Sequence, residues 1–287
     1  MTWFTDRHFF LLAVVIYGLS TVYAVFLWRM GFRKDDRVNY LLLLAAFALH
    51  TIAMLQRGFS IAHCPVNNLY EATTFIGWTI VAAYLVVGLL PRLRFFGAFA
   101  SPVLFAIGVF ALMPALDLPH ELKPQFSSVL TSLHAALILL AYGAFGLSAV
   151  AALMFLTEEH DLKFHKLRAF FSLLPPIQRL ERVMSGLVIG GLFLLATGLA
   201  IGLKLIEIQQ KNGAVAPFNF KNDPFYFYRE PLVTYLIFIW AFYFGLLMAR
   251  WRLGQGGRRF AWGTVAGFVF ILLTFWGFLL LSPIHQP

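Results

Sequence analysis

Long apolar runs separated by short polar segments are the dominant pattern of this chain. A run of about 18 or more apolar residues predicts a transmembrane helix, because a helix rises about 1.5 Å per residue and must cross about 30 Å of hydrocarbon. The pattern predicts about eight spans, at residues 8–28, 39–56, 71–90, 95–113, 127–156, 183–205, 231–250 and 260–281. We therefore expect an all-α fold, a polytopic transmembrane helical bundle in which residues 1–287 form a single domain.

One polar connection is long enough to have a structure of its own. Residues 157–182, TEEHDLKFHKLRAFFSLLPPIQRLER, mix charged residues with Phe and Leu and are broken at Pro175-Pro176. This mixture predicts an interfacial amphipathic segment, and docking of a partner is the alternative. The span that follows contains two pairs of glycines at four-residue spacing, which predict close helix packing. These are Gly186 with Gly190 and Gly198 with Gly202.

Composition and charge support a membrane protein and orient it. The 287 residues are 60% hydrophobic and 12% charged, whereas soluble domains carry about 25% charged residues. The net charge of +9 would suit a nucleic-acid partner, but Lys and Arg concentrate in alternate loops, at 29–37, 92–94, 163–182 and 250–259. Such loops face the cytoplasm. We expect no nucleic-acid partner, a bacterial inner membrane with an organelle membrane as the alternative, and both termini on the outer, periplasmic side.

Histidines are the candidate ligands, and on this topology six of the eight lie toward the outer side. Imidazole binds metals and is an axial ligand of haem iron. A histidine within a span is costly and usually functional, although a hydrogen bond inside the bundle explains His50 and His134 equally well. The histidine spacing matches no zinc motif, and the sequence contains no P-loop and no G-x-S-x-G. The chemistry therefore favours binding over catalysis, and we expect no catalytic residue.

One polar segment at the mouth of an apolar span carries a family resemblance. HCPVNNLYEATTFIGW, residues 63–78, resembles the H-x-P-x-x-N-L-Y-E-S-x-x-F-x-x-W motif of the CcsA/HemX family, integral membrane proteins of cytochrome c assembly. Residues 128–156 resemble the family's helix that begins x-L-H, and stretches 174–202 and 260–277 resemble its later spans. Four motifs in the family's order indicate this family.

The resemblance implies haem handling at the outer face. It implies axial ligands at His134 and His285, and it matches His63 to the histidine before the N-L-Y-E motif. The family's tryptophan-rich W-D-P stretch appears here as FYFYREPLVTYLIFIW. Glu230 stands where the family has aspartate, and phenylalanine and tyrosine residues, including Tyr228, replace its tryptophans. These departures move the chain toward the HemX-like branch.

Other residues are expected around a non-covalently bound haem b. Rings from residues 218–228 and Trp78 would cover the porphyrin, and the outward cations Arg57, Lys221 and Arg229 would pair with its propionates. Met248 occupies the position of a further histidine of the family. His50 and Met248 are therefore considered together as a possible second site within the membrane.

The favoured function is a membrane protein that holds or delivers haem for cytochrome c maturation. The expected partners are apocytochrome c, a second membrane subunit of the assembly system and the lipid bilayer. One alternative is a HemX-like regulator of haem biosynthesis that acts through its cytoplasmic loops. A small-solute transporter is the third reading.

Overall fold

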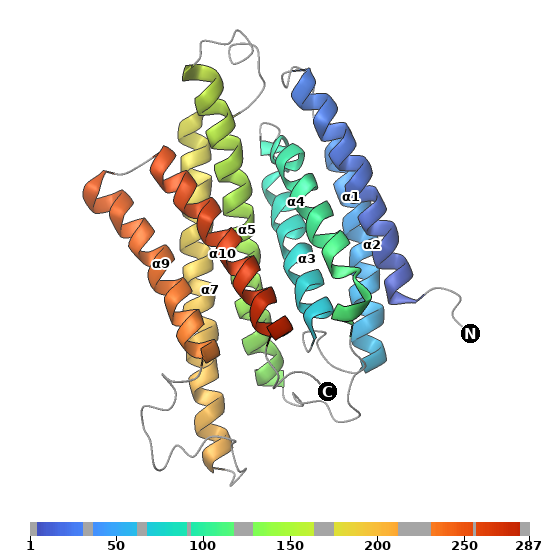
Figure 1. Cartoon of the computed structure of the whole chain (residues 1–287), viewed down its shortest axis with the longest axis vertical. Helices are drawn as coiled ribbons and strands as arrows, with labels where there is room; N and C mark the ends of the chain where they lie inside the picture. Colours follow the sequence, from blue (N-terminus) through green and yellow to red (C-terminus); the bar gives the residue numbers. More distant parts are fainter. Residues whose placement is uncertain are drawn as a thin grey trace.

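The computed structural model describes residues 5–30, 37–61, 68–90, 93–117, 129–163, 175–211, 231–254 and 257–281. In these ranges the fold is all-helical, with eight α-helices and one short 3-10 helix, η2 (Pro114–Leu116) (Figure 1). The α-helices are α1 (Asp6–Arg29), α2 (Arg37–Ile61), α3 (Leu69–Val87), α4 (Phe96–Ala111), α5 (Val129–Lys163), α7 (Ile177–Lys211), α9 (Pro231–Leu253) and α10 (Arg258–Leu281).

Each apolar run predicted from the sequence corresponds to one helix. Six helices (α1, α2, α3, α5, α7 and α9) are long and apolar enough to cross a membrane, and α4, with Pro102 inside it, is a shorter apolar helix. The prediction of an all-α, multi-pass membrane protein is therefore confirmed.

Two helices are much longer than their apolar runs. Helices α5 and α7 each contain 35 residues, which corresponds to about 50 Å. Residues 157–163 continue α5, and Ile177–Arg182 form the first turns of α7 directly after Pro175-Pro176. These parts of segment 157–182 therefore belong to long helices and not to a separate interfacial helix, whereas residues 164–174 lie outside the described chain.

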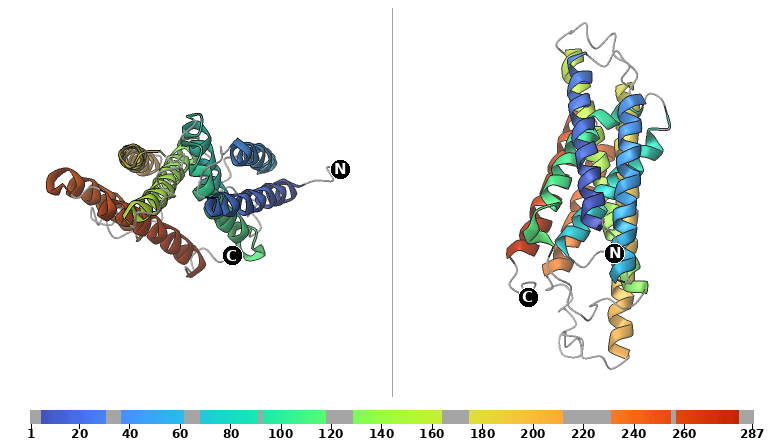
Figure 2. Two further views of the ribbon diagram at one scale, coloured as in Figure 1. Left: turned by 90° about the horizontal axis from the view of Figure 1, so that it is seen from above. Right: turned by 90° about the vertical axis from the view of Figure 1, so that its right-hand side faces the viewer.

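The helices form two groups that meet at α5. Helices α1 to α4 pack together on one side, and α7, α9 and α10 lie on the other (Figure 1). Helix α5 packs along α7 and α10 and also contacts α3 and α4. The view from above shows α2 and α9 on opposite flanks (Figure 2).

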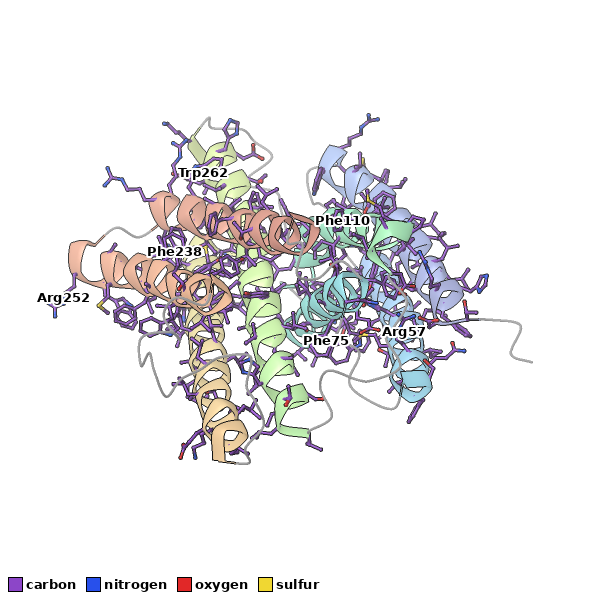
Figure 3. The ribbon with its side chains drawn as sticks, turned by 60° about the horizontal axis from the view of Figure 1, so that its bottom comes forward. Arg57, Phe75, Phe110, Phe238, Arg252 and Trp262 are labelled. Carbon is purple, nitrogen blue, oxygen red and sulfur yellow. The ribbon has the colours of Figure 1, made fainter. Side chains whose placement is uncertain are left out.

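The interior is filled with aromatic and small residues, and large apolar side chains cover the outside. Tyr17, Tyr84 and Tyr243 are almost completely buried, and Phe145 stacks on Tyr243 at a ring distance of 4.0 Å, which joins α5 to α9. Phe238 and Trp262 are among the side chains that remain more than half exposed (Figure 3). Apolar outer surfaces of this kind suit contact with lipid, because lipid imposes no cost on exposed hydrocarbon.

The bundle has two distinct ends. We call the Arg57 end the one at which α1, α3, α5 and α9 begin and α2, α4, α7 and α10 finish (Figure 1). The opposite, Arg250 end carries most cations of the described chain: Arg29, Arg37, Arg94, Lys163, Arg179, Arg182, Arg250, Arg252, Arg258 and Arg259. The first residue of α1 and the last residue of α10 therefore lie at the same end, away from this positive charge.

Candidate functional site

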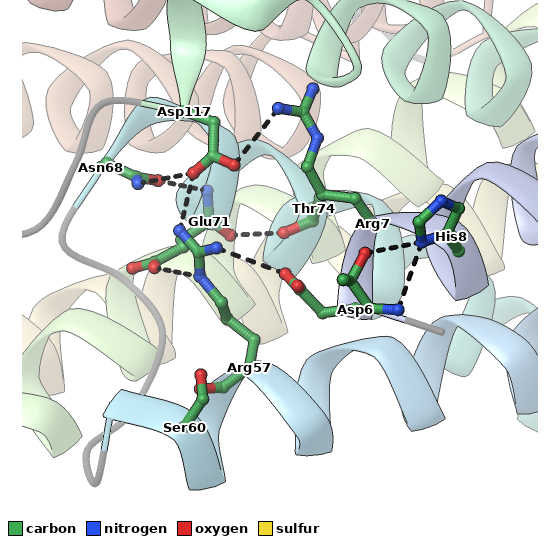
Figure 4. A network of polar contacts seen from close by, with 10 residues as sticks. Asp6, Arg7, His8, Arg57, Ser60, Asn68, Glu71, Thr74 and Asp117 are labelled. Atoms are coloured by element: carbon green, nitrogen blue, oxygen red, sulfur yellow. Dashed lines mark hydrogen bonds and ion pairs between the residues drawn. The ribbon is translucent and has the colours of Figure 1, made fainter. Parts of the chain in front are cut away.

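A cluster of charged side chains ties four parts of the chain together at the Arg57 end (Figure 4). The guanidinium of Arg57, on α2, donates from Nε to Glu71 Oε1 at 2.9 Å and from Nη2 to Asp117 Oδ1 at 2.6 Å. Its Nη1 lies 3.3 Å from Asp6 Oδ2. Asp6 begins α1, Glu71 lies in the first turn of α3 and Asp117 follows η2. One cation thus fixes the ends of α1, α2 and α3 and the segment after α4.

A second guanidinium completes the cluster. Arg7 lies 3.4 Å from Asp117 and donates to the carbonyl of Leu112 at 2.9 Å. The ring of Tyr70 lies beneath both guanidiniums, with its centroid 5.6 Å from Cζ of Arg7 and 5.4 Å from Cζ of Arg57. Cation–π contacts of this length are attractive. Three carboxylates therefore share two guanidiniums around one aromatic ring.

The polar motif at residues 68–71 supplies local structure to this cluster. Asn68 caps α3 by accepting a hydrogen bond from the backbone N–H of Glu71 at 2.8 Å, and its side-chain amide donates to Asp117 at 3.3 Å. The side chain of Glu71 is completely buried. An acidic residue in the first turn also interacts favourably with the helix dipole. The motif therefore positions a buried carboxylate for Arg57.

The structure changes how Arg57 is interpreted. The sequence predicts a free outward cation for a haem propionate, but all three nitrogens of its guanidinium face resident carboxylates. A propionate would have to compete with them. The partners Asp6 and Asp117 were not identified from the sequence, because they lie 51 and 60 residues from Arg57. The only available signal was that acidic residues are rare in this chain.

His134 lies in the first turns of α5, half-buried against α7. Its Nδ1 is 2.7 Å from the carbonyl oxygen of Gly198. Because a carbonyl only accepts hydrogen bonds, Nδ1 carries the proton, and Nε2 of the neutral ring keeps its lone pair. The ring lies so close to Gly202 that a Cβ there would be 2.7 Å from its Cε1. Gly198 and Gly202 together form the surface on which the imidazole rests.

Trp78 and His50 lie in the α1–α4 half. The indole N–H of Trp78 donates to Thr51 at 2.9 Å and its ring lies 5.5 Å from that of Phe47, so it packs against α2. His50 is 1% exposed and contacts Tyr17 and Phe10 of α1. Met248 is on α9, on the opposite flank from α2 (Figure 2). His50 and Met248 therefore do not form a common site.

The remaining site residues predicted from the sequence lie outside the described ranges. These are His63, Lys221, Tyr228, Arg229, Glu230 and His285. Among the residues that are described, no group of three or more His, Cys, Asp or Glu side chains is arranged to hold a metal ion.

Comparison with known proteins agrees with the sequence motifs. Residues 66–204 match the family described as cytochrome C assembly protein. The chain is 26% identical to Protein HemX of Bacillus subtilis (strain 168) over 191 residues, which cover 66% of this chain and 69% of that protein. It is 26% identical to the cytochrome c biogenesis protein CcsA of Gloeobacter violaceus over 258 residues, 75% of each chain. CcsA of Mesostigma viride is 24% identical over 292 residues, 95% of this chain and 90% of that protein. The resemblance found in the motifs is therefore confirmed, and the chain is a relative of the CcsA/HemX family of integral membrane proteins.

Proposed function

We propose that this chain is a component of cytochrome c maturation that holds haem b, without a covalent bond, at the outer face of the membrane. His134 and His285 would be the axial ligands. The match to the cytochrome C assembly family covers His134, and several relatives are named cytochrome c biogenesis protein CcsA. These similarities support a role in assembly, and the two ligands are those that the family resemblance implies.

The hydrogen bond between Nδ1 of His134 and the carbonyl of Gly198 is the observation that carries the proposal. Ligating histidines usually donate their other ring N–H to a carbonyl or carboxylate, which fixes the ring and raises the basicity of the ligating nitrogen. The bond from Nδ1 to Gly198 provides this second partner. Nε2 points away from it, because the two nitrogens lie on diverging edges of the ring. His134 therefore fits an axial ligand.

Chain geometry is compatible with a second ligand from the C-terminus. Helix α10 finishes at Leu281, at the same end of the bundle as His134. His285 is four residues further along, so its Cα can lie no more than about 14 Å from that of Leu281. Bound haem supplies an iron whose two axial positions both take imidazole, an arrangement suited to carrying haem. Tyr228, Arg229 and Glu230 directly precede α9 at this end and are proposed to contact the porphyrin.

The distribution of charge supports the proposed orientation. The cation-rich Arg250 end would face the cytoplasm, and the Arg57 end, His134 and both termini would then lie outside. In a bacterial inner membrane this side is the periplasm, where apocytochrome c would be the client. A second membrane subunit would complete the assembly system. The residues of this chain would bind and orient haem, and no side chain is assigned as a nucleophile.

Substitution of His134 tests the proposal. We expect purified His134→Ala to lose its Soret band and its haem b signal in a pyridine haemochrome assay, because one axial ligand is missing. His160→Ala is a matched control, because His160 lies on the same helix at the opposite end and is 57% exposed. An unchanged Soret band in His134→Ala would reject this ligand.

A second candidate is regulation of haem biosynthesis through the cytoplasmic segment 157–182, which the resemblance to the HemX-like branch implies and with which a relative named Protein HemX agrees. This function would not require the outward histidines. His134→Ala separates the two candidates, because a regulator would keep its effect on haem synthesis when haem binding is lost.

A further inference from the structure

His50 has an unusual environment for a polar residue in a membrane span. It lies on α2, is 1% exposed, and its Nδ1 is 3.1 Å from the hydroxyl of Tyr17. Its Nε2 is buried and makes no hydrogen bond of standard geometry with the described residues, although the backbone of Thr74 interacts with the ring. Buried polar groups without a partner are rare, and each calls for an explanation, such as an ordered water or a ligand.

A small pocket adjoins the His50 ring. It is lined by His50, Ala53, Met54 and Arg57 on one face of α2, by Tyr70, Glu71 and Thr74 of α3 and by Phe10 of α1. Tyr17, which faces Nδ1, does not line this pocket, so we take the opposite, Nε2 edge of the ring to be the one that faces it. The pocket has room for about one water molecule. It therefore has the size of one water molecule, and although most of its surface is apolar, His50, Arg57, Glu71 and Thr74 bring polar groups to it.

The chemistry of the lining selects among ligands. A porphyrin does not fit, because the space is of the size of a single water. A metal ion is disfavoured by the guanidinium of Arg57, and an anion by the carboxylate of Glu71, whose side chain is completely buried. Water suits both tautomers of His50, because it accepts from Nε2–H when Tyr17 donates to Nδ1 and donates to Nε2 when Nδ1 carries the proton.

We propose that this pocket is a water-binding site, in which water joins Nε2 of His50 to the Arg57–Glu71 ion pair. The ion pair belongs to a cluster that reaches solvent, because the side chains of Asp6, Arg57 and Asp117 are 17%, 15% and 12% exposed. The bound water therefore gives the His50–Tyr17 pair, inside the membrane, a hydrogen-bonded connection to the outer surface. The site does not depend on haem and stands apart from the proposed function.

Water-edited solid-state NMR on the full chain in lipid nanodiscs measures this contact directly. Magnetisation from water should reach the His50 ring, as it should reach the exposed ring of His8, and should not reach the buried ring of Phe145. Transfer to His8 without transfer to His50 in the unmodified protein would overturn the proposal, whatever the behaviour of any variant.

A filled pocket provides the matched variant. Ala53 is 3% exposed and lines the pocket, so Ala53→Leu places carbon where the water is proposed to bind. We expect the water signal at His50 to fall to the level of Phe145. Ala48→Leu makes the same change on the exposed face of α2 and should leave the signal unchanged. An unaltered His50 signal in folded Ala53→Leu would contradict the site.

Discussion

At the scale of single residues, Arg57 has more carboxylate partners than any other described residue at its end of the bundle. It contacts carboxylates from α1, α3 and the segment after η2. Buried ion pairs contribute little net free energy when intact, because desolvation offsets attraction, but removal of one partner leaves a buried charge uncompensated. Removal of Arg57 would leave the carboxylate of Glu71 as such an uncompensated charge, since its side chain is completely buried.

We therefore expect Arg57→Gln to lower the free energy of unfolding by about 3 kcal/mol. Unfolding of the protein in mixed micelles, followed by tryptophan fluorescence, measures this loss. The double variant Arg57→Gln with Glu71→Gln should recover part of it, because the unpaired charge is removed. Arg7→Gln is the control and should cost less, since Arg7 is more exposed and has one carboxylate partner among the described residues, at 3.4 Å. Equal losses for Arg7→Gln and Arg57→Gln would contradict the assigned role.

At the scale of helices, the glycines of α7 show how far a sequence pattern predicts helix packing. The two pairs have the same four-residue spacing, which predicts close packing for both. The structure places Gly198 against Ile138 and Gly202 against His134, but a Cβ at Gly186 or Gly190 would meet no described residue within 4 Å. Spacing identifies a common helix face, but it does not determine whether a neighbour covers that face along its whole length.

This difference provides a paired test of the haem proposal. Gly202→Ala and Gly190→Ala both raise helix propensity by a similar amount, about 1 kcal/mol. Only the Cβ at position 202 would press on the His134 ring, at 2.7 Å from Cε1, and disturb its bond to Gly198. We expect Gly202→Ala to lower the ratio of haem to protein, with Gly190→Ala unchanged. Equal haem content in the two folded variants would show that this ring position is not required.

Helix existence was predictable from hydropathy, but helix length and side-chain partners were not. Apolar runs indicate the part of each helix that lies in lipid, whereas α5 continues through Thr157–Lys163 because backbone hydrogen bonds do not require apolar side chains. The polar motif before α3 marked a site, yet its partners Asp6 and Asp117 are brought to it only by the packing of α1 and α4. The histidine at position 134 was predicted as a ligand candidate, but its tautomer depends on a carbonyl 64 residues away.

At the scale of the whole molecule, the charge difference between the two ends determines the expected orientation. Positively charged loops remain in the cytoplasm, and the Arg250 end holds the exposed cations of the α9–α10 connection, Arg252, Arg258 and Arg259. Alkaline phosphatase fused after Gln286 should therefore be active and green fluorescent protein at the same position dark, because both lie outside. Fusions after Gly254 should give the reverse. The opposite result at both positions would place His134 in the cytoplasm, where it cannot present haem to a periplasmic apocytochrome, and the proposed function would fail even if haem were bound.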